Sequence, residues 1–249
     1  MDLGGKKALV TGASRGIGKA TALALAKEGA DVAINYVNNG NLASEVAEQI
    51  ESMGSKTLVL QADVGDSQQV KSMFRTIKQQ WGGVDVLVNN AGGRCDGALL
   101  ELDESSWKRA LEVHLLGTVR CCRLALPAMI ERREGAVVNV GSVAGLRGVK
   151  EIAAYATVKA AIMHLTRCLA MEVSQHNVRV NCVAPGIIDT DFHTVTPAEV
   201  KKHAVDNRIM LHRLGRPEEV AQTIVFLVKN DYITGEVLMV DGGLTMRIA

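Results

Sequence analysis

The chain has 249 residues, of which 47% are hydrophobic and 22% are charged, and its formal net charge is +1. This nearly balanced charge does not favour a nucleic acid or an anionic membrane as partner. No uninterrupted apolar run reaches the roughly 18 residues of a membrane span, and the chain enters its first apolar stretch, 6–11, without room for a signal sequence. We therefore expect a cytoplasmic protein that binds neither nucleic acid nor membranes.

The five cysteines and six histidines show no pattern typical of a cross-linked or metal-binding protein. The cysteines form no CxxC pair and are odd in number, so we expect reduced thiols that mostly pack in the interior. The histidines lack metal-ligand spacing, so we expect no metal site.

A glycine-rich turn at 12–18 follows a short apolar strand, 6–11, and precedes a helix rich in Ala and Leu that ends near Gly29. Glycines let the backbone approach a pyrophosphate, and a helix N-terminus offers free N–H groups and a partial positive charge. The spacing is G-x-x-x-G-x-G, not the G-x-G-x-x-G of the general dinucleotide-binding fingerprint. The turn alone is weak evidence, but with a strand before it and a helix after it the stretch indicates a phosphate-binding site.

The second predicted strand, 31–36, ends about 20 residues beyond the glycine turn, where an acidic residue would bind the ribose 2′-hydroxyl of NAD. The chain has Asn35, Tyr36 and Val37 at this place, with no carboxylate. Arg15, inside the glycine turn, offers a guanidinium suited to a 2′-phosphate. NADP(H) is therefore favoured over NAD(H), and the alternative interpretation of Arg15 is a solvated loop arginine.

Strand and helix patterns alternate along the rest of the chain and predict a parallel sheet covered on both faces. In chain order they are helix 42–53, strand 57–61, helix 67–80, strand 84–88, helix 104–131 with an interruption near Pro127, strand 136–140, helix 155–174, strand 178–184, helix 217–228 and strand 237–240. We expect a three-layer Rossmann fold, a doubly wound α/β protein with about seven parallel strands. We interpret residues 1–249 as one domain, and the polar segment 189–213, with a helix from Pro197, as its substrate lid.

Several polar residues follow the predicted strands directly. They are Asp63, the run Asn89–Gly92 and Ser142. Because ligands of open α/β sheets bind at the carboxyl ends of the strands, we expect these residues to meet the glycine turn at one site. Asp63 has two interpretations: it accepts a hydrogen bond from an adenine amino group, or it caps the helix that starts near residue 66.

Tyr155 and Lys159 are four positions apart in a predicted helix, so their side chains share one face. An ammonium favours phenolate over phenol, so we expect Lys159 to lower the pKa of Tyr155 from about 10 and to make it a general acid or base. Ser142 ends the strand before this helix and is the expected third member of the group. Taken alone, such a pair is common on solvated helix faces.

These motifs together resemble the short-chain dehydrogenases/reductases, and most closely the 3-oxoacyl-acyl-carrier-protein reductases among them. The resemblance covers nearly the whole chain and rests on Thr11–Gly18, Asn89–Gly92 followed by Arg94 and Asp96, Ser142, Tyr155-x-x-x-Lys159, Pro185-Gly186 and the ending Ile233–Gly243. Each motif is modest by itself, and the ordered set is specific.

The resemblance implies an NADPH-dependent carbonyl reductase of fatty acid biosynthesis that transfers hydride to the ketone of a 3-oxoacyl thioester. Tyr155 would donate the proton, Lys159 would lower its pKa and hold the nicotinamide ribose, and Ser142 would bind the substrate oxygen. The implied cofactor-binding residues are Gly12, Ser14, Arg15, Gly16, Ile17, Gly18, Tyr36, Asn38, Asp63, Val64, Asn90, Ala91, Gly92, Tyr155, Lys159, Pro185, Gly186, Ile188 and Thr190. The alternatives are a related alcohol, polyol or sugar dehydrogenase and a non-catalytic cofactor-binding regulatory protein.

The chain departs from the family pattern at His114, where the family usually has an asparagine that holds a water behind the lysine. An imidazole can replace it through one ring nitrogen and can change charge near pH 6–7, so His114 is our fourth catalytic candidate. The resemblance also implies a homotetramer and acyl carrier protein as a partner. Arg132 and Arg133 match one basic docking position, whereas His176-Asn177 stands where a second basic site is expected.

Overall fold

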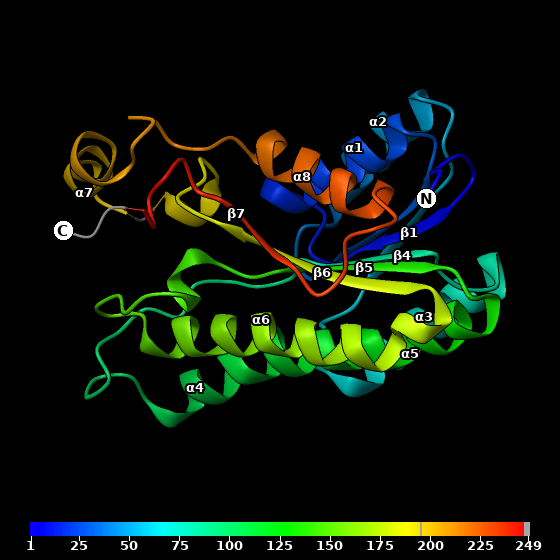
Figure 1. Cartoon of the computed structure of the whole chain (residues 1–249), viewed down its shortest axis with the longest axis horizontal. Coiled ribbons are helices and arrows are strands. Elements are labelled where there is room, and N and C mark those ends of the chain that lie inside the picture. Colours follow the sequence, from blue (N-terminus) through cyan, green and yellow to red (C-terminus); the bar gives the residue numbers. More distant parts are fainter. Residues whose placement is uncertain (195, 247–249) are drawn as a thin grey trace.

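A computed structural model describes residues 1–194 and 196–246, except for the side chain of His193. Figure 1 shows three layers, in which a central sheet lies between two groups of helices. The sheet contains β1 (Lys7–Val10), β2 (Asp31–Tyr36), β3 (Thr57–Gln61), β4 (Val86–Asn89), β5 (Gly135–Val140), β6 (Val178–Pro185) and β7 (Val237–Val240).

The strands have the order β3-β2-β1-β4-β5-β6-β7, and every neighbouring pair is parallel. The chain therefore moves outward in one direction from β1 to β3 and in the other from β4 to β7. Between β1 and β4 the order reverses, and loops that leave the two strands on opposite faces open a crevice there. The predicted fold class, a doubly wound α/β sheet of about seven strands, is confirmed.

Helices cover both faces because each strand is apolar on both sides. One face carries α1 (Gly16–Lys27), α2 (Gly40–Ser52) and α8 (Pro217–Lys229), and the other carries α3 (Ser67–Trp81), α5 (Gly117–Arg132) and α6 (Ala153–Val173). Successive side chains of a strand point to opposite faces. Val88 accordingly packs in the first core and Leu87 in the second, and Val138 and Val137 divide in the same way.

The long predicted helix 104–131 is divided at a different place from the one we expected. It consists of α4 (Glu104–Ala110), a π-helical segment η1 (Leu111–Leu116) and α5, and Pro127 lies inside α5 without interrupting it. Proline removes one helical hydrogen bond, and buried neighbours such as Leu126 and Met129 hold the helix against the sheet across this position. The wider π turn instead falls at His114, a type of irregularity that is frequent at functional sites.

The same stretch, Glu104–Arg132, is long and apolar enough to cross a membrane by length and composition, and 44% of its apolar window is buried inside the protein. The core helix of a soluble protein passes the same test, so this property alone is weak evidence for a membrane span. In this chain its buried side packs on the sheet through Cys121, Cys122 and Met129.

The segment that follows β6 is more helical than predicted. It contains a short 3₁₀ turn η4 (Asp191–His193), α7 (Ala198–His203) and a π-helical turn η5 (Ala204–Arg208). Its two ends meet, because Gly215 N donates to Ile187 O (3.0 Å) and Asp189 N donates to Gly215 O (2.8 Å). The segment is therefore a long loop that leaves the carboxyl end of the sheet and returns to it, with its two ends hydrogen-bonded to each other.

Candidate active site

The glycine turn has a conformation that side chains would prevent. Gly12 has φ +63°, and a Cβ built on it would lie 3.0 Å from the Cα of Ala91. At Gly18 a Cβ would lie 2.2 Å from the carbonyl oxygen of Gly12. The turn thus brings bare backbone and the first N–H groups of α1 to the crevice, which is the arrangement that binds phosphate groups.

Asn90 joins the end of β4 to this turn. Its Nδ2 donates to the carbonyl oxygens of Thr11 (2.9 Å) and Gly12 (3.0 Å), while the hydroxyl of Thr11 accepts from the backbone N–H groups of Asn90 and Ala91 at 3.0 Å each. These bonds hold the predicted Asn-Asn-Ala-Gly loop against the glycine turn, so the two motifs share one wall.

Asn35 has a structural role that the sequence did not reveal. It is buried at the end of β2, where its Nδ2 donates to Ala62 O (2.9 Å) and its Oδ1 accepts from Gly12 N (3.2 Å). In the sequence this position indicates only that an acidic residue is missing. A polar residue at the end of an otherwise apolar strand was the available signal, because a buried amide needs such partners.

Asp63 does not cap a helix. Asp66 is the N-cap of α3 and accepts from the backbone of Gln68 and Gln69, whereas Asp63 pairs with Arg109 (Oδ2 to Nη2, 2.8 Å) and accepts from Gly65 N. The capping interpretation of Asp63 is therefore wrong, because Asp66 lies next to the helix start. Asp63 lines the crevice near the end of β3, and its proposed contact with adenine stays a prediction.

A cavity of about 790 Å³ runs along the carboxyl ends of the strands, a size typical of small-molecule sites. Every residue that the sequence predicted for catalysis or cofactor binding lines it. These residues come from the glycine turn, the end of β2, the ends of β3 and β4, η1, the end of β5, α6 and the loop after β6. Parallel strands place such distant segments together because their carboxyl ends share one edge of the sheet.

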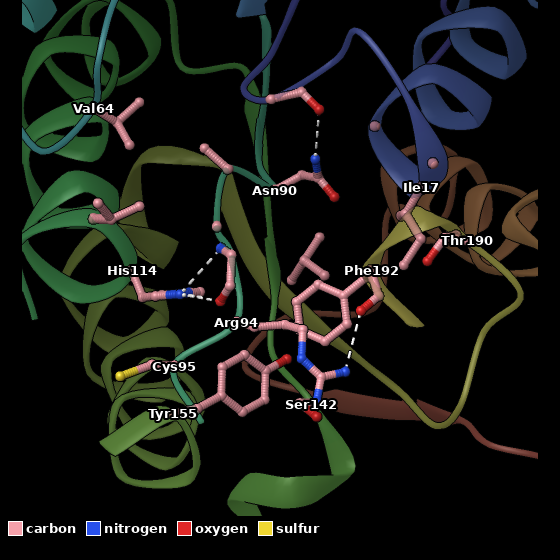
Figure 2. A pocket seen from close by; sticks show the side chains of 18 of the residues that line it. Ile17, Val64, Asn90, Arg94, Cys95, His114, Ser142, Tyr155, Thr190 and Phe192 are labelled. Atoms are coloured by element: carbon pink, nitrogen blue, oxygen red, sulfur yellow. Dashed lines mark hydrogen bonds between the residues drawn. The ribbon is translucent and has the colours of Figure 1, made fainter. Parts of the chain in front are cut away.

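Ser142 and Tyr155 both line this cavity and lie near each other (Figure 2). Ser142 follows β5 and accepts from Ala144 N at 3.2 Å. Burial raises the pKa of the Tyr155 phenol, and a hydrogen bond with Ser142 and the charge of Arg94 oppose this effect. Our prediction of a lowered tyrosine pKa is therefore wrong for this structure, because burial disfavours the phenolate more strongly than nearby charges favour it.

Lys159 is buried, and its ammonium is turned to the end of β5. Its Nζ donates to Val140 O at 2.7 Å and lies 5.6 Å from the centroid of the Tyr155 ring. Burial lowers the pKa of Lys159 to about 8. Tyr155 and Lys159 do share one helix face toward the cavity, but the lysine contacts a backbone carbonyl rather than the phenol oxygen.

His114 projects from η1 to the loop after β4, as Figure 2 shows. Its Nε2 lies 3.0 Å from Gly93 O and 3.3 Å from Gly93 N, and its ring stands edge-on to Tyr155 at 5.5 Å between centroids. Burial, followed by the charge of Lys159, lowers the pKa of His114 to about 3. The expected charge change near pH 6–7 is therefore wrong, because the buried imidazole stays neutral.

Comparisons with known proteins agree with this geometry. The family model described as Enoyl-(Acyl carrier protein) reductase matches residues 12–245. The chain is 40% identical over 243 residues to the 3-oxoacyl-[acyl-carrier-protein] reductase FabG of Staphylococcus aureus, covering 97% of this chain and 98% of the relative. It is 41% identical to the protein of the same name from Thermotoga maritima, covering 99% and 100%.

Among solved structures, a short-chain type dehydrogenase/reductase from Mycobacterium marinum has a TM-score of 0.92 and 34% identity, covering 99% of this chain and 98% of that one. The chain belongs to the short-chain dehydrogenase/reductase family. It is an oxidoreductase that acts on CH–OH and C=O groups. The L-sorbose reductase from Gluconobacter frateurii, a structure complexed with NADPH and L-sorbose, has a TM-score of 0.92 and 31% identity, covering 100% of both chains.

In this short-chain dehydrogenase/reductase two contacts join the predicted lid to the cavity walls. Arg15 Nη1 lies 3.5 Å from Asp191 Oδ2, which connects the glycine turn to η4. The ring of Phe192 lies 5.8 Å from that of Tyr155 and 5.6 Å from the guanidinium of Arg94. The sequence did not identify Asp191 or Phe192, because contacts between loops carry no local pattern.

The cysteines of the enzyme are free thiols, as predicted. Cys121, Cys122 and Cys182 are buried, and burial raises the pKa of each thiol. They therefore act as packing residues. Cys95 lines the cavity, and burial also raises the pKa of its thiol.

Proposed function

We propose that the enzyme is an NADPH-dependent reductase of 3-oxoacyl thioesters. One observation carries the proposal: Ser142, Tyr155 and Lys159 line the same cavity as the phosphate-binding turn, so a hydride donor and a carbonyl can meet at the tyrosine. The curated relatives that the chain matches over nearly its full length are 3-oxoacyl-[acyl-carrier-protein] reductases.

The side chains supply the proton and hold the substrate. NADPH supplies a hydride when it is bound. Ser142 and the phenol of Tyr155 donate hydrogen bonds to the substrate carbonyl oxygen, which stabilises the charge that develops there. Because burial keeps the pKa of Tyr155 high, the phenol is protonated at neutral pH and gives its proton to the forming alkoxide. This protonation state favours reduction over oxidation near pH 7.

Lys159 supports the tyrosine from behind. Its ammonium, fixed on the carbonyl of Val140, brings a positive charge within 5.6 Å of the phenol ring. That charge stabilises the tyrosinate left after proton transfer. With a pKa of about 8, Lys159 itself loses its charge in mildly alkaline solution, so this support weakens there.

The residues that would hold the cofactor fit a phosphorylated dinucleotide. The turn at 12–18 and the N-terminus of α1 would hold the pyrophosphate. A Cβ at Gly18 would clash with Gly12 O at 2.2 Å, so the turn can keep this shape only with glycine there. Arg15 and Asn38 would meet the 2′-phosphate, since both line the cavity. The Arg15 guanidinium, which lies 3.5 Å from Asp191, would turn from that carboxylate to the phosphate. Thr190 would contact the nicotinamide amide, and its side chain lies near Gly16. NADPH preference follows from Arg15 together with the lack of a carboxylate after β2.

His114 acts as a neutral positioning residue. Its Nε2 lies within hydrogen-bond distance of both Gly93 O and Gly93 N and so holds the loop after β4, which fixes the wall beside Tyr155. A Cβ at Gly92 would lie 2.4 Å from the ring of His114, so the loop and the imidazole are fitted to each other. The low pKa of His114 excludes proton exchange through an imidazolium near neutral pH.

The chain acts as one catalytic domain, 1–249, in which residues 189–213 form the substrate lid. Support comes from the closed base of this segment at Gly215 and from the packing of Phe192 on Tyr155.

We also propose a cytoplasmic homotetramer, whose interfaces would be formed by the helices that include α5 and α6, together with β7. Acyl carrier protein would present the thioester and dock near Arg132 and Arg133. Arg132 pairs with Asp85 and Arg133 donates to Gln175 O, so docking would have to compete with these contacts.

The test is turnover with defined substrates. NADPH and NADH oxidation would be followed with acetoacetyl, crotonyl and simple ketone substrates, using wild type and Tyr155→Phe. We expect NADPH-dependent reduction of the acetoacetyl thioester and its loss in the variant. If crotonyl thioester is the only substrate that turns over, the enzyme reduces the C=C bond of enoyl thioesters and not a carbonyl. Preference for NADH would contradict the role of Arg15. No turnover of any substrate in either direction would refute the proposal.

A further inference from the structure

Arg94 brings a positive charge to the substrate end of the cavity. It follows β4 in the loop after Gly93, and Figure 2 shows its side chain reaching toward the ends of Tyr155 and Ser142. Its guanidinium and the Tyr155 ring both pack on Phe192, at 5.6 and 5.8 Å between centres. The charge of Arg94 also counteracts the raised pKa of Tyr155. Arg94 therefore lies within electrostatic reach of the reacting oxygen.

The guanidinium is held in one orientation. Its Nε pairs with Asp96, and its Nη1 donates to Phe192 O (3.2 Å) and to Thr196 Oγ1 (3.0 Å). Within 1–194 and 196–246, Nη2 has no hydrogen-bond partner. A fixed guanidinium with an available N–H edge loses little side-chain entropy when it binds an acceptor.

The surroundings of Arg94 make such an acceptor valuable. Phe192 packs on the guanidinium of Arg94, and Leu102 packs in one small cluster with Cys95, the residue after Arg94. Both line the cavity, and neither side chain offers a hydrogen bond. A small ketone without a second polar group would leave the Nη2 edge of Arg94 facing apolar atoms. A 3-oxoacyl thioester instead carries its thioester carbonyl two carbons from the ketone, on the same short chain. A 3-oxo acid carries a carboxylate at the same place.

We propose that Arg94 contacts the substrate and selects ketones that bear a second acceptor oxygen two carbons from the reacting carbonyl. The ketone binds at Ser142 and Tyr155, and the second oxygen accepts from Nη2 of Arg94. Asp96 pairs with the guanidinium and offsets part of its charge, which favours the neutral thioester carbonyl over a carboxylate. This inference rests on the proposed carbonyl-reductase function and assigns the residue that recognises its substrate class.

The experiment compares kcat/KM of wild type, Arg94→Met and Arg94→Lys on acetoacetyl thioester, acetoacetate and 2-pentanone. Loss of a charge-assisted hydrogen bond should lower kcat/KM for the thioester by about 10- to 100-fold, mainly through KM. The value for 2-pentanone should change by less than about threefold, so the ratio between the two substrates falls. Arg94→Lys should restore part of the ratio, because a lysine keeps the charge without the fork.

Two further variants separate recognition from lid anchoring. Thr196→Val removes one hydrogen bond from Arg94 to the lid and keeps the guanidinium, so it should change kcat/KM for all three substrates by the same factor. Arg75 is an exposed arginine on α3, and the matched control Arg75→Met should leave kcat/KM unchanged for all three. A larger effect of Arg94→Met on acetoacetate than on the thioester would identify a carboxylate as the recognised group, and the reverse would identify the thioester carbonyl.

An unchanged substrate ratio in Arg94→Met would overturn the inference and leave the proposed function intact. An equal loss on all three substrates would also overturn it, because it would assign Arg94 to lid anchoring alone. If wild type reduces no ketone, the proposed function fails first, and this inference fails with it. The two failures are distinguishable, because failure of the proposed function is seen with wild type alone, before any variant is measured.

Discussion

His114 makes the stability of the folded protein sensitive to acid. Burial holds its pKa at about 3 in the folded state, whereas an exposed histidine has a pKa of about 6.5. The unfolded chain therefore binds a proton that the folded protein excludes. Stability is unaffected by this group above pH 6.5, and it falls as the pH drops from 6.5 toward 3.

The magnitude follows from the gap between the two pKa values. At pH 4.5, two units below the pKa of an exposed histidine, His114 is protonated in the unfolded chain and neutral in the folded protein. The free energy of unfolding is therefore about 2.5 kcal/mol lower at pH 4.5 than at pH 7. Urea unfolding of wild type and His114→Asn at pH 7 and pH 4.5, at one protein concentration, measures this difference. The variant should lose about 2.5 kcal/mol less than wild type on acidification.

The control is His176→Asn, in the 3₁₀ turn after α6, which should follow wild type at both pH values. Equal acid losses in wild type and His114→Asn would refute the reasoning, because they would mean that the imidazole is hydrated or already paired when protonated. The difference between the two pH values is what counts, since the substitution also changes packing at both.

Three other predictions concern the cofactor crevice. Gly18→Ala would force a Cβ to within 2.2 Å of Gly12 O and should lower the free energy of unfolding by about 1–3 kcal/mol. The midpoint temperature of thermal unfolding should fall by several degrees. Gly148→Ala, which has open space around its Cβ, should leave that temperature unchanged. Asn35→Ala should lose about 1–3 kcal/mol because buried partners of its amide lose their bonds, and an unchanged urea midpoint would contradict this. Arg15→Gln should raise the KM for NADPH about tenfold or more and leave that for NADH nearly unchanged, and equal shifts would show that Arg15 does not read the 2′-phosphate.

Most of the fold could be predicted from local patterns. Strands such as β5 and β6 are buried on both faces and appear as continuous apolar runs, and the glycine turn marks the first strand–helix unit. The errors fell where tertiary packing overrides a local signal. Pro127 stays inside α5 because residues before and after it pack against the sheet. The π turn at η1 has no simple sequence signature.

The site was predictable as a set of positions, but its electrostatics were not. Ser142, Tyr155 and Lys159 were identified from spacing and resemblance, and all three line the cavity. The direction of the Tyr155 pKa shift and the neutral state of His114 were predicted wrongly. Both errors have one cause: spacing along a helix indicates which groups are neighbours, whereas desolvation depends on everything packed around them.

By itself, the sequence determined the parallel sheet, the glycine turn and the choice of Ser142, Tyr155 and Lys159 as candidates, because periodicity, glycine spacing and motif order are properties of the chain. Only the tertiary structure decided that Asn35 and Asn90 brace the glycine turn, that Lys159 is turned to Val140, and that Arg94 and Phe192 meet beside Tyr155. These contacts join loops far apart in the chain. They form because parallel strands bring their carboxyl ends to one edge, where burial then sets the charge of each group.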